Sequence, residues 1–194
     1  TPEMGPITTG LGEIYQYTLE VKPEYKSQYS VTDLRTIQDW VVKRQLSGIK
    51  GVVEINTWGG YLKQYEIAIV PSSLKAMNIT TLDVFNALEK NNSIAGGAYI
   101  EKTNQSYFIR AEGKVKSIQD IENIVVKNTN GLPIYVKNVA QVNFGYANRF
   151  GAITGNGEGE KVLGQVMMLK GGNSKQVIND VKARVAEIQK SLPK

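Results

Sequence analysis

The chain has 194 residues, a formal net charge of +5, no cysteine and no histidine. Hydrophobic residues make up 41% of it, which is typical of a folded protein with a core of its own. The missing residue types exclude disulfides, thiolate and imidazole metal ligands, and the usual nucleophile–base pairs of hydrolases. We therefore expect no catalytic residue, no cofactor and no metal site, and we expect that the chain is not an enzyme.

Basic and acidic residues alternate along the chain, without a block of five or more lysines and arginines. This pattern indicates a solvated surface and not a patch for nucleic acid or lipid. Residues 1–6 lack the regions of a signal peptide, and no apolar run approaches the roughly 20 residues of a membrane helix. We expect a soluble chain, with no contact to nucleic acid or membrane.

The first 60 residues predict a strand–helix–strand unit. Apolar and polar residues alternate over 13–21, which indicates a half-buried strand. Ser30, with Asp33 three residues later, forms the capping box of a helix. Gly48 is expected to end that helix in a left-handed conformation. Residues 52–57 predict the next strand, after which a Trp-Gly-Gly sequence turns the chain away.

A second unit closes the chain. Residues 150–154 and 161–169 predict a hairpin around Gly155-Asn156-Gly157. Ser174 is expected to cap a final helix, and Pro193 to stop it. The apolar face of this helix is predicted from five residues at helical spacing: Val177, Ile178, Val181, Val185 and Ile188.

The middle of the chain begins with a predicted strand over 64–70 and a helix capped by Thr80 and Asp83. Residues 98–102 and 105–111 predict a hairpin with Thr103-Asn104 at its tip. The buried side of the helix is expected to consist of Val84, Phe85 and Leu88.

A short helical turn then begins at Ser117. Three strands are expected at 124–127, 134–137 and 139–144, with Asn130-Gly131 as the turn between the first two. The pattern as a whole predicts an α+β fold in which 1–60 and 149–194 share one sheet and 61–148 is inserted between them.

Four segments carry a resemblance to a known family. They are GLGEIYQYTLE (10–20), LRTIQDWVVKRQLSGIKGVVEINTWGGYLKQYEIAIVP (34–71), DVFNALEKNNSIAGGAYIEK (83–102) and YFIRAEGKVKSIQDIENIVVKN (107–128). This wording resembles the heavy-metal efflux branch, of CzcA/CusA type, of the resistance–nodulation–division (RND) transporters.

The resemblance implies a domain assignment. Residues 1–60 and 149–194 would form the second N-terminal porter subdomain, and 61–148 an inserted docking subdomain. The porter subdomain of this family resembles a ferredoxin-like fold whose last strand follows the final helix. We expect that strand to be missing here and the sheet to have an exposed edge.

The resemblance also implies a function and partners. The chain would be the periplasmic part of a proton-driven inner-membrane pump for heavy-metal cations in a Gram-negative bacterium. It would serve trimer assembly, the substrate path and docking to an outer-membrane channel, beside a periplasmic adaptor protein. Relatives that export copper or silver tend to carry methionine at 145–149. This chain has Asn148 and no methionine there, which favours zinc, cobalt, cadmium or nickel.

Two groups of residues are candidates for a role in such a pump. The predicted hairpin matches the arm that reaches a neighbouring protomer, and its apolar residues favour an interface over core packing. They are Tyr99, Ile100, Tyr107 and Phe108. Trp58, at the end of a strand, either lines the substrate path or fills the joint between the domains.

Other patterns favour ordinary structural roles. The Gly155–Gly159 loop precedes a strand, which indicates a hairpin turn and not a phosphate loop. Met167 and Met168 point to opposite faces of a strand, so they cannot share one ion. Glu158 and Glu160 have no third ligand in view and are expected to be solvated.

Two alternative functions remain: a free-standing periplasmic domain that binds a cation or small molecule, and a hydrolase that uses carboxylates alone.

Overall fold

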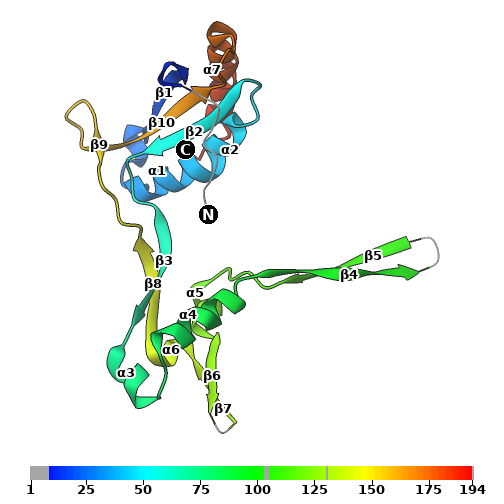
Figure 1. Cartoon of the computed structure of the whole chain (residues 1–194). Coiled ribbons are helices and arrows are strands. Elements are labelled where there is room, and N and C mark those ends of the chain that lie inside the picture. Colours follow the sequence, from blue (N-terminus) through cyan, green and yellow to red (C-terminus); the bar gives the residue numbers. More distant parts are fainter. Residues whose placement is uncertain (1–8, 103–104, 130, 194) are drawn as a thin grey trace. The chain divides into compact units, whose positions relative to one another are not determined.

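A computed structural model describes residues 9–102, 105–129 and 131–193, without the side chains of 94–99, 102 and 108–112. The chain divides into two compact units (Figure 1). The first contains residues 1–63 and 147–194, and the second contains residues 64–146. The mixture of helices and separate antiparallel ladders confirms the predicted α+β class.

The first unit is built on an antiparallel sheet with the strand order β1-β10-β2. Its strands are β1 (Glu13–Leu19), β2 (Val52–Trp58) and β10 (Glu160–Met168), with the short β9 (Ile153–Thr154) beside β10. The helical segments are η1 (Gly10–Gly12), η2 (Pro23–Tyr25), α1 (Val31–Ile37), η3 (Gln38–Val42), α2 (Lys43–Leu46) and α7 (Ser174–Ser191).

The core of the first unit lies between the sheet and its helices. Leu46 of α2, Ile55 of β2, Val166 of β10 and Val181 of α7 are all fully buried there. β1 and β2 each pair with a strand on one side only within the described residues. Both outer strands therefore have an unpaired edge within the described residues, and the missing last strand stays a prediction.

Three details of this unit differ from the sequence prediction. The helix that begins at the Ser30–Asp33 capping box ends at Leu46, and the positive φ belongs to Gly51 instead of Gly48. α7 is capped by Asn173, one residue before Ser174, because the Asn173 side chain accepts the amide N–H of Gln176. A π-helical turn, η3, also interrupts the first helix.

The second unit consists of three two-stranded ladders with short helices. The ladders are β3 (Lys63–Ile69) with β8 (Ala140–Tyr146), β4 (Ile94–Lys102) with β5 (Gln105–Glu112), and β6 (Val125–Thr129) with β7 (Leu132–Tyr135). The helices are α3 (Pro71–Ala76), α4 (Thr81–Lys90), α5 (Ile118–Glu122) and α6 (Val136–Val139). Their packed side chains include Val84, Ile121, Val136 and Val139.

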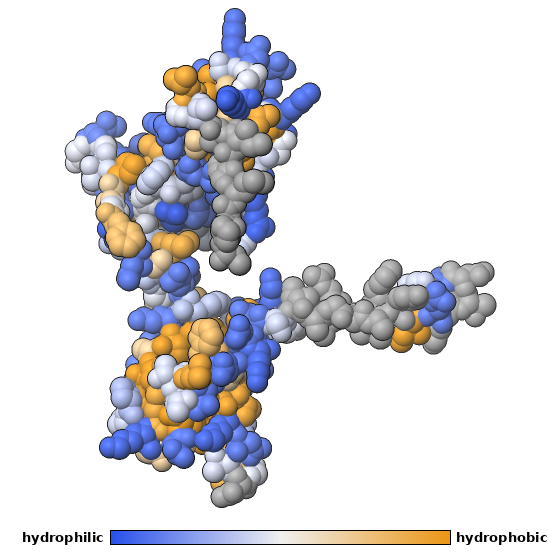
Figure 2. All heavy atoms as spheres, viewed as in Figure 1, coloured by the Kyte–Doolittle hydropathy of each residue, from blue (hydrophilic) through white to orange (hydrophobic). Residues whose placement is uncertain are grey.

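Two predictions for the second unit were wrong. Residues 136–139 form the helix α6 and not the end of a strand, since Val136 and Val139 turn together into the core. Phe85 is 59% exposed, and Ala87 takes the expected place on the buried face of α4. Hydrophobic residues gather on the face of this unit seen in Figure 2. Of the predicted turn between the strands, Asn130 lies outside the described residues and Gly131 has a φ of 84°.

Candidate functional site: a crossover, an open sheet face and a hairpin

Two glycines form the exit of the chain from the first unit. Gly59 and Gly60 follow β2 with φ values of 74° and 68°, which side chains other than glycine rarely adopt. A Cβ on Gly59 would lie 2.1 Å from the carbonyl oxygen of Lys161. Glycine is therefore required at both positions by backbone conformation, and at Gly59 also by the close approach of β10.

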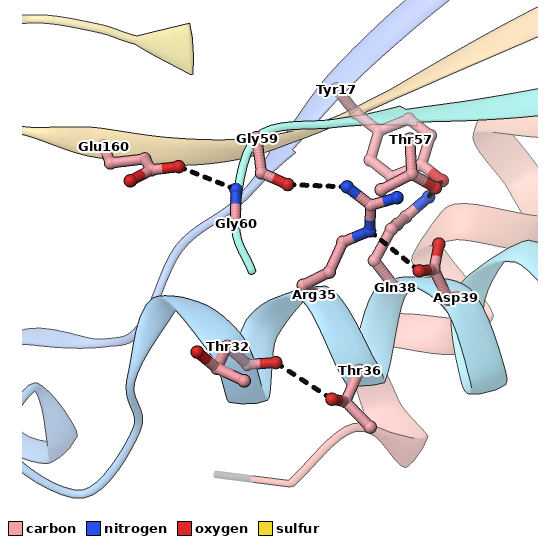
Figure 3. A network of polar contacts seen from close by, with 10 residues as sticks. All are labelled: Tyr17, Thr32, Arg35, Thr36, Gln38, Asp39, Thr57, Gly59, Gly60 and Glu160. Atoms are coloured by element: carbon pink, nitrogen blue, oxygen red, sulfur yellow. Dashed lines mark hydrogen bonds and ion pairs between the residues drawn. The ribbon is translucent and has the colours of Figure 1, made fainter. Parts of the chain in front are cut away.

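Charged side chains hold this exit in place (Figure 3). Arg35 of α1 donates to the Gly59 carbonyl at 2.8 Å and forms an ion pair with Asp39 at 2.7 Å. The Glu160 carboxylate accepts a hydrogen bond from the backbone N–H of Gly60, with 2.9 Å between Oε1 and the nitrogen.

The returning chain is tied to the same carboxylate. Arg149 forms an ion pair with Glu160, and its guanidinium lies 3.8 Å from the centre of the Tyr61 ring. Both crossings between the units are thus fixed on the first unit. Glu160, predicted to be solvated, is part of this network, whereas Glu158 pairs with Lys161.

A buried amide lies beneath the same helix. Gln38, at the start of the π-helical turn, is completely buried. Its Nε2 lies 2.9 Å from the Tyr17 hydroxyl and 3.5 Å from the Thr57 hydroxyl. Burial raises the pKa of Tyr17 to about 12 because it disfavours the phenolate, while the hydrogen bond with Gln38 acts in the opposite direction. The sequence contains no signal for this contact, since a glutamine in a helix usually faces water.

Trp58 lies on the sheet face opposite the core. Strand alternation places Asn56 and Trp58 on this face, because Ile55, the residue before Asn56, is buried in the core. The Trp58 indole, 51% exposed, donates to Gln165 Oε1 at 3.3 Å. Gln165 in turn donates to Glu13 at 2.8 Å, so a row of polar contacts crosses all three strands.

The sulfur of Met167 belongs to the same face. It accepts a hydrogen bond from the Asn56 amide at 3.1 Å, whereas Met168 is buried in the core. The two methionines thus face opposite sides, as predicted. Whether Trp58 lines a substrate path stays a prediction.

The predicted hairpin is present and longer than expected. β4 and β5 run out from the helices of their unit in Figure 1. Ile100 and Tyr107 are cross-strand partners and are 48% and 54% exposed. The Tyr107 hydroxyl donates to Gln105 at 2.9 Å. The side chains of Tyr99 and Phe108, and the tip at Thr103-Asn104, lie outside the described residues.

The described residues offer little for metal chemistry or for membrane crossing. They contain no group of three or more acidic side chains that could hold a metal ion. None of the described helices combines the length and the apolar character that crossing a bilayer requires.

The sequence profile of the AcrB/AcrD/AcrF family matches residues 1–194. The chain belongs to this family. It is 46% identical over 196 residues to the cobalt-zinc-cadmium resistance protein CzcA of Cupriavidus metallidurans, with 99% of this chain and 18% of that protein covered. It is 38% identical over 192 residues to the cation efflux system protein CusA of Escherichia coli, with 98% and 18% covered.

A crystal structure of a heavy metal efflux pump matches the whole chain. The TM-score is 0.80 at 28% identity, and 19% of that pump is covered. The match confirms the expected heavy-metal branch of the RND transporters. The chain spans about a fifth of the length of these relatives.

Proposed function

We propose that the chain is the periplasmic porter and docking portion of a proton-driven inner-membrane efflux pump for heavy-metal cations. The observation that carries this proposal is the match of the whole chain to one part of a heavy metal efflux pump. The lack of a metal-binding acidic cluster in the described residues agrees with a segment that shapes a path instead of holding an ion. Energy and proton transfer then belong to other parts of the pump.

The two units take different tasks in this proposal. The first unit is the porter subdomain. The second is the docking subdomain, which faces an outer-membrane channel, with a periplasmic adaptor protein beside the porter. The network of Arg35, Glu160 and Arg149 supports this division, because it fixes both crossing segments to the porter sheet.

Trp58 lines part of the cation path on the open sheet face. Its indole is half exposed although it is hydrogen-bonded to Gln165, so it presents an aromatic surface beside polar groups. The CzcA relative is named for resistance to cobalt, zinc and cadmium, and residues 145–149 of this chain include no methionine. Both observations favour these borderline divalent cations over copper or silver.

The hairpin of β4 and β5 is the arm that reaches a neighbouring protomer. Ile100 and Tyr107 are large apolar residues on a two-stranded ladder, and about half of each side chain is exposed. Large exposed apolar side chains on such an element are typical of an interface. The proposed assembly is a trimer of the full-length pump.

We predict that Tyr107→Ala combined with Phe108→Ala weakens this trimer, because aromatic anchors contribute much of the energy of an interface. The fraction of trimer is measured by native mass spectrometry of the detergent-purified full-length pump. Circular dichroism of the 194-residue chain should show unchanged folding.

The matched control is Leu132→Ala, which removes an exposed apolar side chain from β7 of the same unit. It should leave the trimer intact. Equal trimer fractions in the double variant and the unchanged pump would contradict the role of the arm.

A further inference from the structure

A groove lies along the outer edge of β2. Within the described residues β2 pairs only with β10, so its other edge presents backbone N–H and C=O groups that no strand covers. The groove has a volume of about 350 Å³. Asn56 and Thr57 form its strand side, and one face of the helix from α1 to α2 forms the other.

Of the basic side chains that line this groove, one is paired with a described carboxylate and two are not. Arg35 is neutralised by Asp39 and also bonded to the Gly59 carbonyl, as Figure 3 shows. Lys43 and Arg44, which also line the groove, form no ion pair with a described carboxylate. The groove therefore carries uncompensated positive charge beside a free strand edge.

An aromatic side chain adjoins these cations. Trp40 lines the groove, is 60% exposed, and its ring lies 4.3 Å from the Arg44 guanidinium. Exposed tryptophan and arginine are the residue types that most often dominate binding energy at interfaces. A stacked arginine keeps its outward N–H groups available for a carboxylate.

We propose that the outer edge of β2 and this groove bind an extended, acidic protein segment as an added strand. Backbone groups of the segment would pair with β2, its carboxylates would meet Lys43 and Arg44, and an apolar side chain would lie on Trp40. Side chains of an extended segment alternate in direction, and Trp40, Lys43 and Arg44 all line the same groove. The acidic and apolar residues recognised therefore occupy every second position, on the side of the segment that faces the groove.

The other free edge of the sheet has a different character. The groove beside β1 is lined mainly by apolar side chains, among them Leu19, Leu34 and Ile37, together with Glu20 and Lys22. Its two charges have opposite signs, so it offers no preference for an acidic segment. The two edges therefore differ in the segment each would accept. The proposal for β2 does not depend on the transport role proposed above.

The test is a titration of the 194-residue chain with a terminally blocked hexapeptide, Val-Thr-Glu-Thr-Glu-Thr, which presents its valine and both glutamates on one side when extended; binding is followed by amide NMR shifts. We expect shifts at β2 amides and at the Trp40 indole. Replacing glutamate by lysine in the peptide, or methylating its backbone nitrogens, should abolish binding, because the first change removes the charge match and the second removes the strand hydrogen bonds.

Protein variants distinguish binding in the groove from nonspecific attraction of an acidic peptide to a basic protein. Lys43→Glu with Arg44→Glu should weaken binding at least tenfold, and Arg44→Glu alone, at an exposed position, should show a large part of this loss. The matched control is Lys175→Glu with Lys182→Glu on exposed positions of α7, which changes the net charge equally and should keep the affinity. Absent binding, shifts at β1 instead of β2, an equal loss in the control, or full binding of the methylated peptide would each overturn the proposal.

Discussion

At the scale of single residues, the most constrained positions lie where the chain leaves the first unit. Gly59 combines a positive φ with a backbone oxygen where a Cβ would stand. Gly171 also has a positive φ, of 82°, but open space around its Cα. A substitution at Gly171 therefore tests the cost of the backbone conformation alone, whereas one at Gly59 adds a steric clash.

We predict that Gly59→Ala destabilises the first unit more than Gly171→Ala does. The left-handed conformation alone costs an alanine about 1 kcal/mol, and at Gly59 the contact with Lys161 adds to this cost. Urea unfolding monitored by circular dichroism gives both free energies. Equal losses in the two variants would show that the close contact relaxes freely.

Tyr17 provides a test at alkaline pH. Its pKa in the folded protein, about 12, exceeds the value of about 10 in an unfolded chain. The folded state therefore holds this proton more tightly, and the corresponding stability is present below pH 10 and lost as the pH rises toward 12. Tyr17→Phe should remove this part of the alkaline loss, measured as the difference in unfolding free energy between pH 8 and pH 11. An unchanged difference would contradict the burial of the hydroxyl.

At the scale of elements, three helices begin with the same reciprocal cap. Ser30, Thr80 and Ser117 each accept an amide N–H, and an aspartate three residues later accepts the amide of the capping residue. These starts were predicted at Ser30 and Thr80 from the capping-box pattern, and at Ser117 as a helical turn. A cap is a contact between near neighbours in sequence, so the sequence carries its whole signal.

The caps predict acid sensitivity. Hydrogen bonds from the capping residues hold the pKa of Asp33 and Asp83 below the usual value, and a backbone N–H from Lys116 does so first for Asp120. Depressed pKa values stabilise the folded state above the unfolded pKa, near 4, and this contribution is lost as the pH falls through the folded values.

The triple variant Asp33→Asn, Asp83→Asn and Asp120→Asn should be less stable at pH 7 and lose less stability between pH 5 and pH 2.5. Thermal unfolding across this range measures both quantities. Asp180→Asn, at an exposed position within α7, is the control and should change neither. A triple variant with the acid sensitivity of the unchanged chain would contradict the role of the caps.

Elements that depend on distant contacts were harder to predict. The helix over residues 136–139 forms because Val136 and Val139 enter a core built from other segments, and no local pattern distinguishes it from a strand. Phe85 has the helical spacing of a core residue, yet the core beside α4 takes the smaller Ala87. Gln38, where the π-helical turn begins, bonds to partly buried partners on β1 and β2 that lie about twenty residues away in sequence.

At the scale of the whole chain, sequence patterns located both halves of the first unit's sheet. β1 and β2 lie before the second unit and β10 after it, and β10 lies between them in the sheet. The turns at Gly59-Gly60 and at Gly155-Asn156-Gly157 predicted where strands end. The network of Arg149, Glu160 and Tyr61 could not be predicted, because its members are far apart in sequence and each resembles a surface residue.

The role of the chain as one part of a pump is testable by exchange. The segment of Cupriavidus metallidurans CzcA that matches this chain at 46% identity is replaced by these 194 residues. Growth of a metal-sensitive strain is then measured in zinc, cobalt and cadmium, with the amount and assembly of the hybrid protein recorded in the same cells. We predict that the hybrid confers resistance to these cations. A hybrid that reaches the membrane and assembles normally but gives no resistance to any of them would contradict the proposed function.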